Sequence, residues 1–127
     1  MKTEYIPGDL VKYTQLYKEP IAEIIEVRET SYLIRFMNGN FSMATEIEIE
    51  PIPIKEEILK KNGWKYTKIT PSLYQYYKDD IYIKYDKLDE KFKFDDLYWS
   101  AYSFELPYVH TLQHLLFGLG LDSNIKL

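Results

Sequence analysis

Apolar and polar residues alternate along much of the first half of the chain, with the period of two that is typical of half-buried β-strands. Five short β segments can be read, over residues 9–13, 21–27, 32–36, 41–44 and 47–52; the second is an apolar run and the last is a short strand or a turn. Asn38-Gly39 lies between two of these runs and favours a two-residue hairpin turn, because both positions tolerate positive φ. Five strands this short cannot bury both faces of a flat sheet, so we expect them to close into a small barrel.

The segment Glu50-Pro51-Ile52-Pro53 ends this pattern, because two prolines one residue apart cannot continue a strand ladder. Residues 55–61 then carry acids in the first turn and lysines in the last, which predicts a short helix. Asn62-Gly63 follows as its C-terminal cap. We therefore place a boundary between two parts of the chain at this point.

Alternation returns in the second half over residues 64–69, 73–78, 81–85, 91–94 and 97–104, with turn residues such as Asp79-Asp80 between the runs. This spacing predicts an antiparallel meander. After Pro107, apolar residues recur near the helical spacing at Val109, Leu112, Leu116 and Leu119. We expect a helix there, ending near Gly118 or Gly120, that covers one face of the meander.

Three features of the first half occur together: Gly8-Asp9-Leu10-Val11, the alternating Tyr32, Ile34 and Phe36, and the Asn38-Gly39 hairpin. In this combination the first half resembles the Src-homology-3-like small barrels of the Tudor and KOW kind, which implies a binding barrel. The predicted fold class is α+β and mostly antiparallel β. A Src-homology-3-like barrel is expected over residues 1–53, and a short helix, a β-meander and a covering C-terminal helix over residues 54–127.

Two longer motifs stand out: IEPIPI at residues 49–54 leading into EILKKNGW at residues 57–64, and YVHTLQHL at residues 108–115. Together with the tyrosine-rich meander, they resemble a family of small uncharacterised proteins from phages and integrated mobile elements of Bacteroidetes bacteria. The resemblance covers roughly residues 5–127 in arrangement and implies a setting rather than an activity. The chain departs from the family pattern at Lys55-Glu56, where members more often have Thr-Pro, and at Thr111, where they often have glutamate.

Composition narrows the function classes. Cysteine is absent, which excludes disulfides, iron–sulfur clusters and thiolate zinc sites and suits a reducing compartment. The longest apolar stretch, residues 115–121, is far shorter than the ~20 residues of a membrane span, and the start of the chain lacks the apolar run of a signal peptide. We expect a protein of the bacterial host cytoplasm with no membrane partner. Net charge is −4, and residues 1–54 carry five Lys/Arg against nine Asp/Glu; this acidic half argues against a phosphate-backbone partner.

Candidate chemistry begins with His110 and His114, which lie four residues apart, the helical spacing of paired zinc ligands. Thr111 stands where a zinc protease has its glutamate base, and no third ligand is marked. The acidic pairs fall mostly at predicted turns, where solvated carboxylates are usual. They are Glu56-Glu57, Asp79-Asp80, Asp89-Glu90 and Asp95-Asp96. We predict no enzyme and no catalytic, cofactor or metal site, and keep a metal-dependent hydrolase as the weakest alternative.

Aromatic residues make up 17% of the chain, and thirteen of them are tyrosines. The second half holds more than one face of a sheet can accommodate, so some must lie on an open face unless the barrel or a second subunit covers them. The candidate partner surface comprises Tyr74, Tyr76, Tyr82, Tyr98, Trp99 and Tyr102. A homo-oligomer and a core shared with the barrel are both left open.

These patterns predict an accessory binding protein that acts on a protein partner, with antagonism of a host defence system as one setting. The alternative is nucleic-acid binding through a cluster of basic and aromatic residues. Its members are Lys60, Lys61, Trp64, Lys65, Tyr66 and Lys68. Residues 55–127 carry eleven Asp/Glu against eleven Lys/Arg, which weighs against this alternative because such patches usually lie on a net basic domain.

Overall fold

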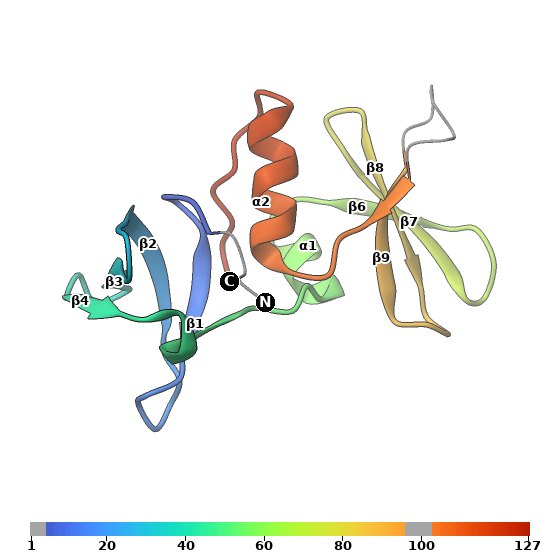
Figure 1. The fold of residues 1–127 in the computed structure, drawn as a ribbon. Coiled ribbons are helices and arrows are strands. Elements are labelled where there is room, and N and C mark those ends of the chain that lie inside the picture. Colours follow the sequence, from blue (N-terminus) through green and yellow to red (C-terminus); the bar gives the residue numbers. More distant parts are fainter. Residues whose placement is uncertain (1–4, 96–102) are drawn as a thin grey trace. The chain divides into compact units, whose positions relative to one another are not determined.

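The structure is a computed structural model that describes residues 5–95 and 103–127. Its contacts divide the chain into two compact units (Figure 1). Unit 1 comprises Met1–Ile52 and Tyr108–Asn124, and unit 2 comprises Pro53–Pro107 and Ile125–Leu127. Each unit contains one five-stranded antiparallel sheet, so the predicted class, α+β and mostly antiparallel β, is confirmed.

Unit 1 has the strand order β4-β3-β2-β1-β5. The strands are β1 (Leu10–Tyr13), β2 (Ile21–Val27), β3 (Tyr32–Phe36), β4 (Phe41–Ala44) and β5 (Ile49–Pro51). Alternate residues point inward and form a core of Tyr5, Val11, Ala22, Ile24, Ile34, Ala44 and Ile49. Among the described residues β4 and β5 do not pair with each other, so the predicted closed barrel is not detected.

Between β4 and β5 the chain forms a 3-10 turn, η1 (Glu46–Glu48). The sequence left a short strand or a turn open from residue 47, and the structure has the turn first, with β5 beginning at Ile49. The cause is local, because the Glu48 carboxylate accepts the N–H of Thr45 at 2.8 Å and the N–H of Glu48 donates to the Thr45 carbonyl at 3.0 Å. This capping box winds residues 46–48 before the strand starts.

The β3–β4 hairpin differs from the predicted two-residue turn. Phe36 N–H donates to the Asn40 carbonyl at 2.8 Å, and Gly39 N–H donates to the Phe36 carbonyl at 2.9 Å, which leaves three residues in the loop. Gly39 has a φ of 91°, whereas Asn38 uses its side chain to accept the Asn40 N–H at 3.0 Å. Two consecutive positive φ values occur instead at Asp79-Asp80, where φ is 50° and 63°.

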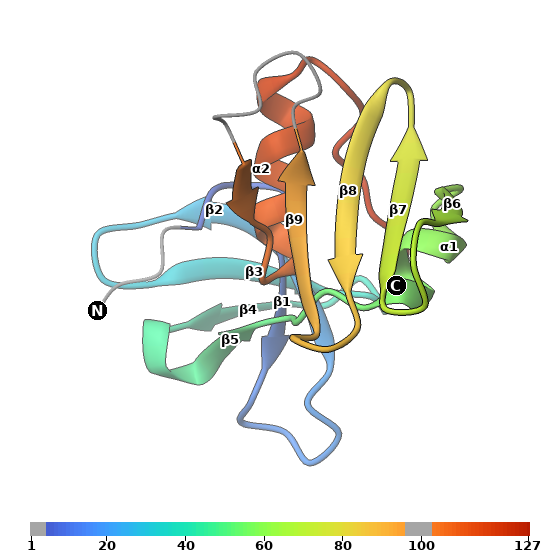
Figure 2. The ribbon, with the colours of Figure 1, turned by 90° about the vertical axis from the view of Figure 1, so that its right-hand side faces the viewer.

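Unit 2 is the predicted meander, with the strand order β10-β9-β8-β7-β6 (Figure 2). Its elements are α1 (Glu56–Lys61), β6 (Lys65–Lys68), β7 (Leu73–Lys78), β8 (Ile81–Asp86), β9 (Lys91–Asp95) and β10 (Ser103–Glu105). The helix α1 ends at Lys61 with Asn62 as its C-cap, and Gly63 follows with a φ of 85°, as the sequence predicts. The first part of the predicted last strand, residues 97–102, lies outside the described residues.

The C-terminal helix α2 (Val109–Gly118) groups with unit 1. This differs from the expectation that it belongs with the meander. The buried residues of α2 include the predicted apolar positions Val109, Leu112 and Leu116, together with His110 and Gln113. An apolar stripe predicts that a helix is buried but does not identify the sheet that it accompanies. Gln113 and His114 of α2 hydrogen-bond to Leu10 and Asp9 at the start of β1, which ties the helix to unit 1.

Candidate functional site

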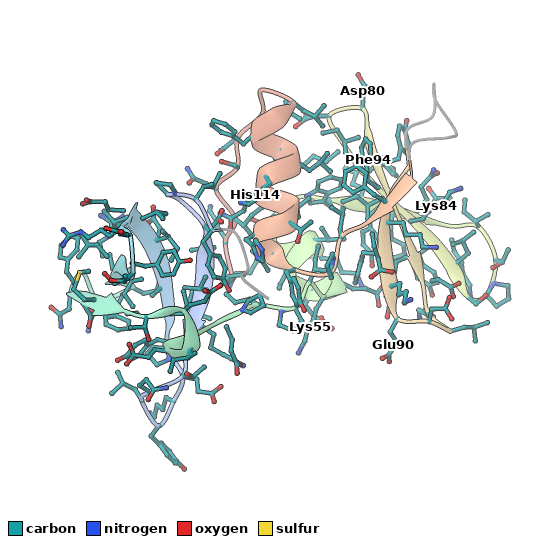
Figure 3. All side chains as sticks on the ribbon, in the orientation of Figure 1. Lys55, Asp80, Lys84, Glu90, Phe94 and His114 are labelled. Atoms are coloured by element: carbon teal, nitrogen blue, oxygen red, sulfur yellow. The ribbon has the colours of Figure 1, made fainter. Side chains whose placement is uncertain are left out.

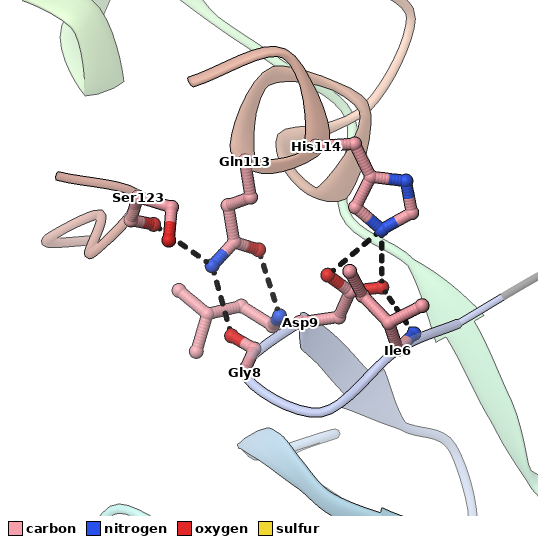
Figure 4. Close-up of polar contacts among 7 residues, drawn as sticks. Ile6, Gly8, Asp9, Gln113, His114 and Ser123 are labelled. Carbon is pink, nitrogen blue, oxygen red and sulfur yellow. Dashed lines mark hydrogen bonds and ion pairs between the residues drawn. The ribbon is translucent and has the colours of Figure 1, made fainter. Parts of the chain in front are cut away.

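Gln113 joins α2 to the segment that enters β1 (Figure 4). Its Oε1 accepts the N–H of Leu10 at 2.9 Å. Its Nε2 donates to the carbonyl oxygens of Gly8 at 2.9 Å and Ser123 at 3.2 Å. The Pro7-Gly8 turn makes this approach possible, since Gly8 has a φ of 97°, which glycine adopts without strain. One buried amide therefore satisfies three backbone groups from two segments.

Asp9 and His114 form a second link between α2 and the segment that enters β1. His114 Nε2 lies 2.8 Å and 3.0 Å from the two carboxylate oxygens of Asp9. Asp9 is buried and also accepts the N–H of Ile6 at 2.9 Å, so its oxygens are well supplied with donors. We call these residues the Asp9–Gln113–His114 cluster. Because its polar atoms bind the protein's own backbone and side chains, we assign the cluster the role of holding α2 on unit 1.

His110 lies one turn before His114, and their ring centroids are 5.5 Å apart, so the predicted shared face is confirmed. His110 is buried, with ring centroids 5.1 Å from Tyr5 and 5.6 Å from Tyr108, and its Nδ1 has no hydrogen-bond partner among the described residues. Burial lowers the pKa of His110; nearby His114 lowers it further, and Asp9 opposes both. In residues 5–95 and 103–127, no three His, Cys, Asp or Glu side chains are grouped so as to hold a metal ion.

The lowered pKa of His110 predicts that the protein loses stability in mild acid. The unfolded chain, with a histidine pKa near 6.5, takes up a proton more readily than the folded one, so protonation favours unfolding. The stability that depends on neutral His110 should be fully present above about pH 6.5 and should fall as the pH drops toward the lowered pKa. Urea unfolding at pH 8 and pH 5 measures this, and a His110→Phe variant should show a smaller difference. An equal pH dependence in both proteins would contradict the assignment.

The predicted tyrosine surface is only partly at the surface. Tyr76 is 0% exposed, and its hydroxyl donates to Glu56, so it cannot contact a partner. Burial raises the pKa of Tyr76, as do the hydrogen bond to Glu56 and its charge, which keeps the hydroxyl protonated. Tyr74 and Tyr82 are half-buried. Tyr98, Trp99 and Tyr102 lie outside the described residues.

Mutual stacking on one face of the second sheet explains where most of its aromatic residues go. Strand register places Tyr66, Tyr74, Tyr76, Tyr85, Phe92 and Phe94 on this face. Tyr66 stacks on Tyr74 with centroids 5.5 Å apart, and Tyr85 stacks on Phe92 at 4.3 Å. The opposite face holds Tyr77 and Tyr82. The surplus of aromatic residues is thus distributed over both faces, but unequally.

The lysine and aromatic cluster does not form one surface. Trp64 is buried, and alternation in β6 places Lys65 on the face opposite to Tyr66 and Lys68. The Nζ of Lys60 lies 5.0 Å above the Tyr66 ring, and Lys61 donates to the carbonyl of Leu127. Some members of the lysine and aromatic cluster therefore lie on opposite faces of the sheet, and others are engaged in local contacts. Sequence proximity brought them together in the prediction, whereas strand alternation separates them.

The acidic pairs lie largely where the sequence predicts them. Figure 3 shows Asp80 and Glu90 at turns at opposite ends of β8. Both have positive φ, which fits turn positions. Glu56-Glu57 occupies the first turn of α1, where the Glu56 side chain accepts the hydrogen bond from Tyr76. Asp95 lies in β9 rather than in the predicted turn, and Asp96 lies outside the described residues.

A groove that sequence reasoning missed lies in unit 1, between the loop of residues 14–20 and the β3–β4 hairpin. We call it the loop–hairpin groove; it measures about 680 Å³. Its lining comprises Leu16, Pro20, Ile21, Phe36, Met37, Asn38, Asn40, Phe41 and Ser42. Leu16 is 52% exposed, Met37 66% and Phe41 58%. Three large apolar side chains on one open groove are unusual, since isolated apolar residues are the norm at a surface.

The sequence contained one signal for this groove. Met37 precedes Asn38-Gly39 at a hairpin tip, where polar residues are usual. Tyr13, Tyr32 and Phe36 attract equal attention in the sequence, but they pack against the core. Only a structure distinguishes these aromatic residues from Phe41, because alternation gives the face of a strand and not the depth of burial.

Charge in unit 1 is predominantly negative. Residues 1–52 and 108–124 carry five Lys/Arg against ten Asp/Glu. Some of the positive charge is already paired, since Arg35 donates to Glu23 at 2.9 Å and Lys12 lies 3.1 Å from Glu19. A charged partner of unit 1 should therefore be basic.

No helix in the described residues is long and apolar enough to cross a membrane. Comparison of the chain with protein-family models, with curated protein sequences and with solved structures finds no match.

Proposed function

We propose that this is a binding protein that acts through protein–protein contact at the loop–hairpin groove. The observation that carries the proposal is the convergence of Leu16, Met37 and Phe41, each more than half exposed, on one groove of a well-packed unit. Interfaces depend on a few large apolar or aromatic anchors that lose water on binding, and methionine is frequent among them. The groove replaces the tyrosine surface as the preferred site.

Two further observations support a binding role. The five-stranded sheet of unit 1, together with the Gly8-Asp9-Leu10-Val11 pattern and the β3–β4 hairpin, supports a relation to the Src-homology-3-like small barrels, which implies a binding fold by analogy. The motifs at residues 49–64 and 108–115 resemble those of Bacteroidetes phage and mobile-element proteins. We therefore propose a partner in the cytoplasm of a bacterial host, with antagonism of a host defence system as the setting.

A double variant, Met37→Ser with Phe41→Ser, should lose partner binding by at least about tenfold, because truncating two central anchors removes more than the 1.4 kcal/mol that a tenfold change requires. Tagged protein is used to recover partners from a Bacteroidetes lysate, and the affinity of the purified partner is then measured for each variant. Ile47→Ser is the matched control, since Ile47 is 88% exposed in unit 1 but does not line the groove. Equal binding by both variants would contradict the proposal.

A further inference from the structure

We propose that the outer edge of β4 binds an extended, basic segment of a partner protein by strand addition. This inference rests on the proposed function, and it specifies the conformation and chemistry of what is bound. Strand addition uses main-chain hydrogen bonds for affinity and alternate side chains for specificity. Its structural requirement is an open sheet edge beside a surface that accepts those side chains.

The backbone of β4 provides the open edge. Among the described residues β4 pairs with β3 alone, in the register Ile34↔Ser42 and Leu33↔Met43. The Phe36 N–H to Asn40 carbonyl bond fixes the phase of the ladder. The direction of the backbone N–H and C=O groups alternates along an antiparallel strand, so these groups of residues 40, 42 and 44 point toward β3. The N–H and C=O groups of Phe41 and Met43 therefore point away from the sheet.

Comparison with the other three sheet edges shows that β4 lacks the usual protection. Exposed edges normally carry charges or proline, which prevent pairing with other chains. Glu50 and Pro51 lie in β5, two lysines lie in β6, and Glu105 lies in β10. The sequence of β4 is Phe-Ser-Met-Ala, without charge or proline. An edge of this kind is suited to accept a strand.

Side chains on one face of β4 supply the adjoining surface. Phe41 and Met43 are both exposed and lie two residues apart, which places them on the same face of the strand. Phe41 also lines the loop–hairpin groove, so the edge and the groove form one continuous surface. An added strand could therefore pack every second side chain on Phe41 and Met43 while the segment beside it occupies the groove.

Charge and size select the occupant. Unit 1 carries five Lys/Arg against ten Asp/Glu, so a segment with Lys or Arg between apolar residues complements it. A second copy of the chain would bring the same negative charge to the contact. β4 has four residues. Pairing two copies of so short an edge would bury far less surface than the roughly 1,200–2,000 Å² that stable protein–protein interfaces typically bury. A basic partner segment therefore fits better than self-association.

The probe is a fluorescent ten-residue peptide that alternates Val and Lys, tested with two N-methylated forms. One form is methylated at every Val amide and the other at every Lys amide, so each blocks one edge of the peptide strand and keeps all side chains. Anisotropy titration should show binding that falls at least tenfold for one methylated form and is retained by the other. In the protein, hydrogen exchange at the Phe41 and Met43 amides should slow on binding.

Met43→Pro removes an outward N–H at an edge position that accepts proline, and it should weaken peptide binding at least tenfold. Met43→Lys, which adds an edge charge that repels the peptide, replaces it if the proline variant does not fold. Ile47→Ser should bind like the original protein.

Equal binding of both methylated forms, or no binding of the unmodified peptide, overturns strand addition. Loss of a partner in the Met37→Ser/Phe41→Ser variant still supports the proposed function in that case. A dimer that Met43→Pro abolishes in sedimentation would overturn the basic segment in favour of self-pairing.

Discussion

Replacing Tyr76 with alanine is expected to lower the free energy of unfolding of the second sheet by about 3–5 kcal/mol, the usual cost of deleting a buried aromatic side chain. Tyr76 is 0% exposed and pairs with Tyr66 on β6 and Ile83 on β8. Removing its ring therefore leaves a cavity on the face of the sheet that these side chains share. Urea unfolding followed by tryptophan fluorescence measures the loss, because Trp64 is buried in the same unit.

Tyr77 provides the matched control for this experiment. It follows Tyr76 in β7, points to the opposite face and is 37% exposed, so Tyr77→Ala should cost about 1 kcal/mol or less. Tyr76→Phe keeps the ring and loses only the hydrogen bond to the Glu56 carboxylate, which is worth about 1.5–3 kcal/mol because the acceptor is charged. If Tyr76→Ala and Tyr77→Ala cost the same, the ring of Tyr76 does not contribute to the core as described.

Local signals predicted the strands well. The bounds of β2, β3, β4 and β7 coincide with the apolar runs over residues 21–27, 32–36, 41–44 and 73–78. Alternation and turn residues act over a few positions, so a single sequence contains the information. The exceptions are also local: Thr45 and Glu48 form a capping box that the alternating isoleucines conceal, and the side chain of Asn38 changes the expected turn.

Depth of burial could not be predicted in the same way. Strand alternation by itself puts Tyr74 and Tyr76 on one face and Tyr77 on the other, and the strand register agrees. It could not show that Tyr76 is wholly buried while Tyr74 is partly exposed, because the difference depends on what packs above each ring. Glu56 in α1 contacts Tyr76 from a position twenty residues away in the sequence. Tertiary neighbours therefore decide which tyrosines remain available to a partner.

The grouping of α2 with unit 1 lay beyond sequence reasoning for a related reason. His110 and His114 stood out because zinc ligands can have their spacing, whereas the residue that His114 contacts, Asp9, is 105 positions away. Asp9 was predicted as the first residue of a strand and as part of the Gly8-Asp9-Leu10-Val11 pattern. Gln113 lies in the motif at residues 108–115, but nothing in the motif indicated the three hydrogen bonds that it makes. Polar pairs of this separation have no periodic pattern that would connect them.

Replacing Gln113 with leucine is expected to destabilise unit 1 by about 2–3 kcal/mol, although the two side chains are similar in size. Leucine leaves the buried N–H of Leu10 without an acceptor and the carbonyl of Gly8 without its donor. Each unsatisfied buried group costs about 1–3 kcal/mol, which is more than the hydrogen bond itself contributes. Urea unfolding followed by circular dichroism gives the total, and hydrogen exchange at the Leu10 amide should become faster because its acceptor is lost.

Gln15→Leu separates this effect from a general cost of removing glutamine. The Gln15 amide makes an exposed hydrogen bond to Thr14, so its loss should change stability by no more than about 0.5 kcal/mol. Unchanged exchange at Leu10 in Gln113→Leu would contradict the cluster's role, even if the protein were destabilised overall. Faster exchange confined to Leu10 and α2 would instead identify Gln113 as the residue that joins this helix to β1, and would explain why an apolar stripe alone did not predict the grouping.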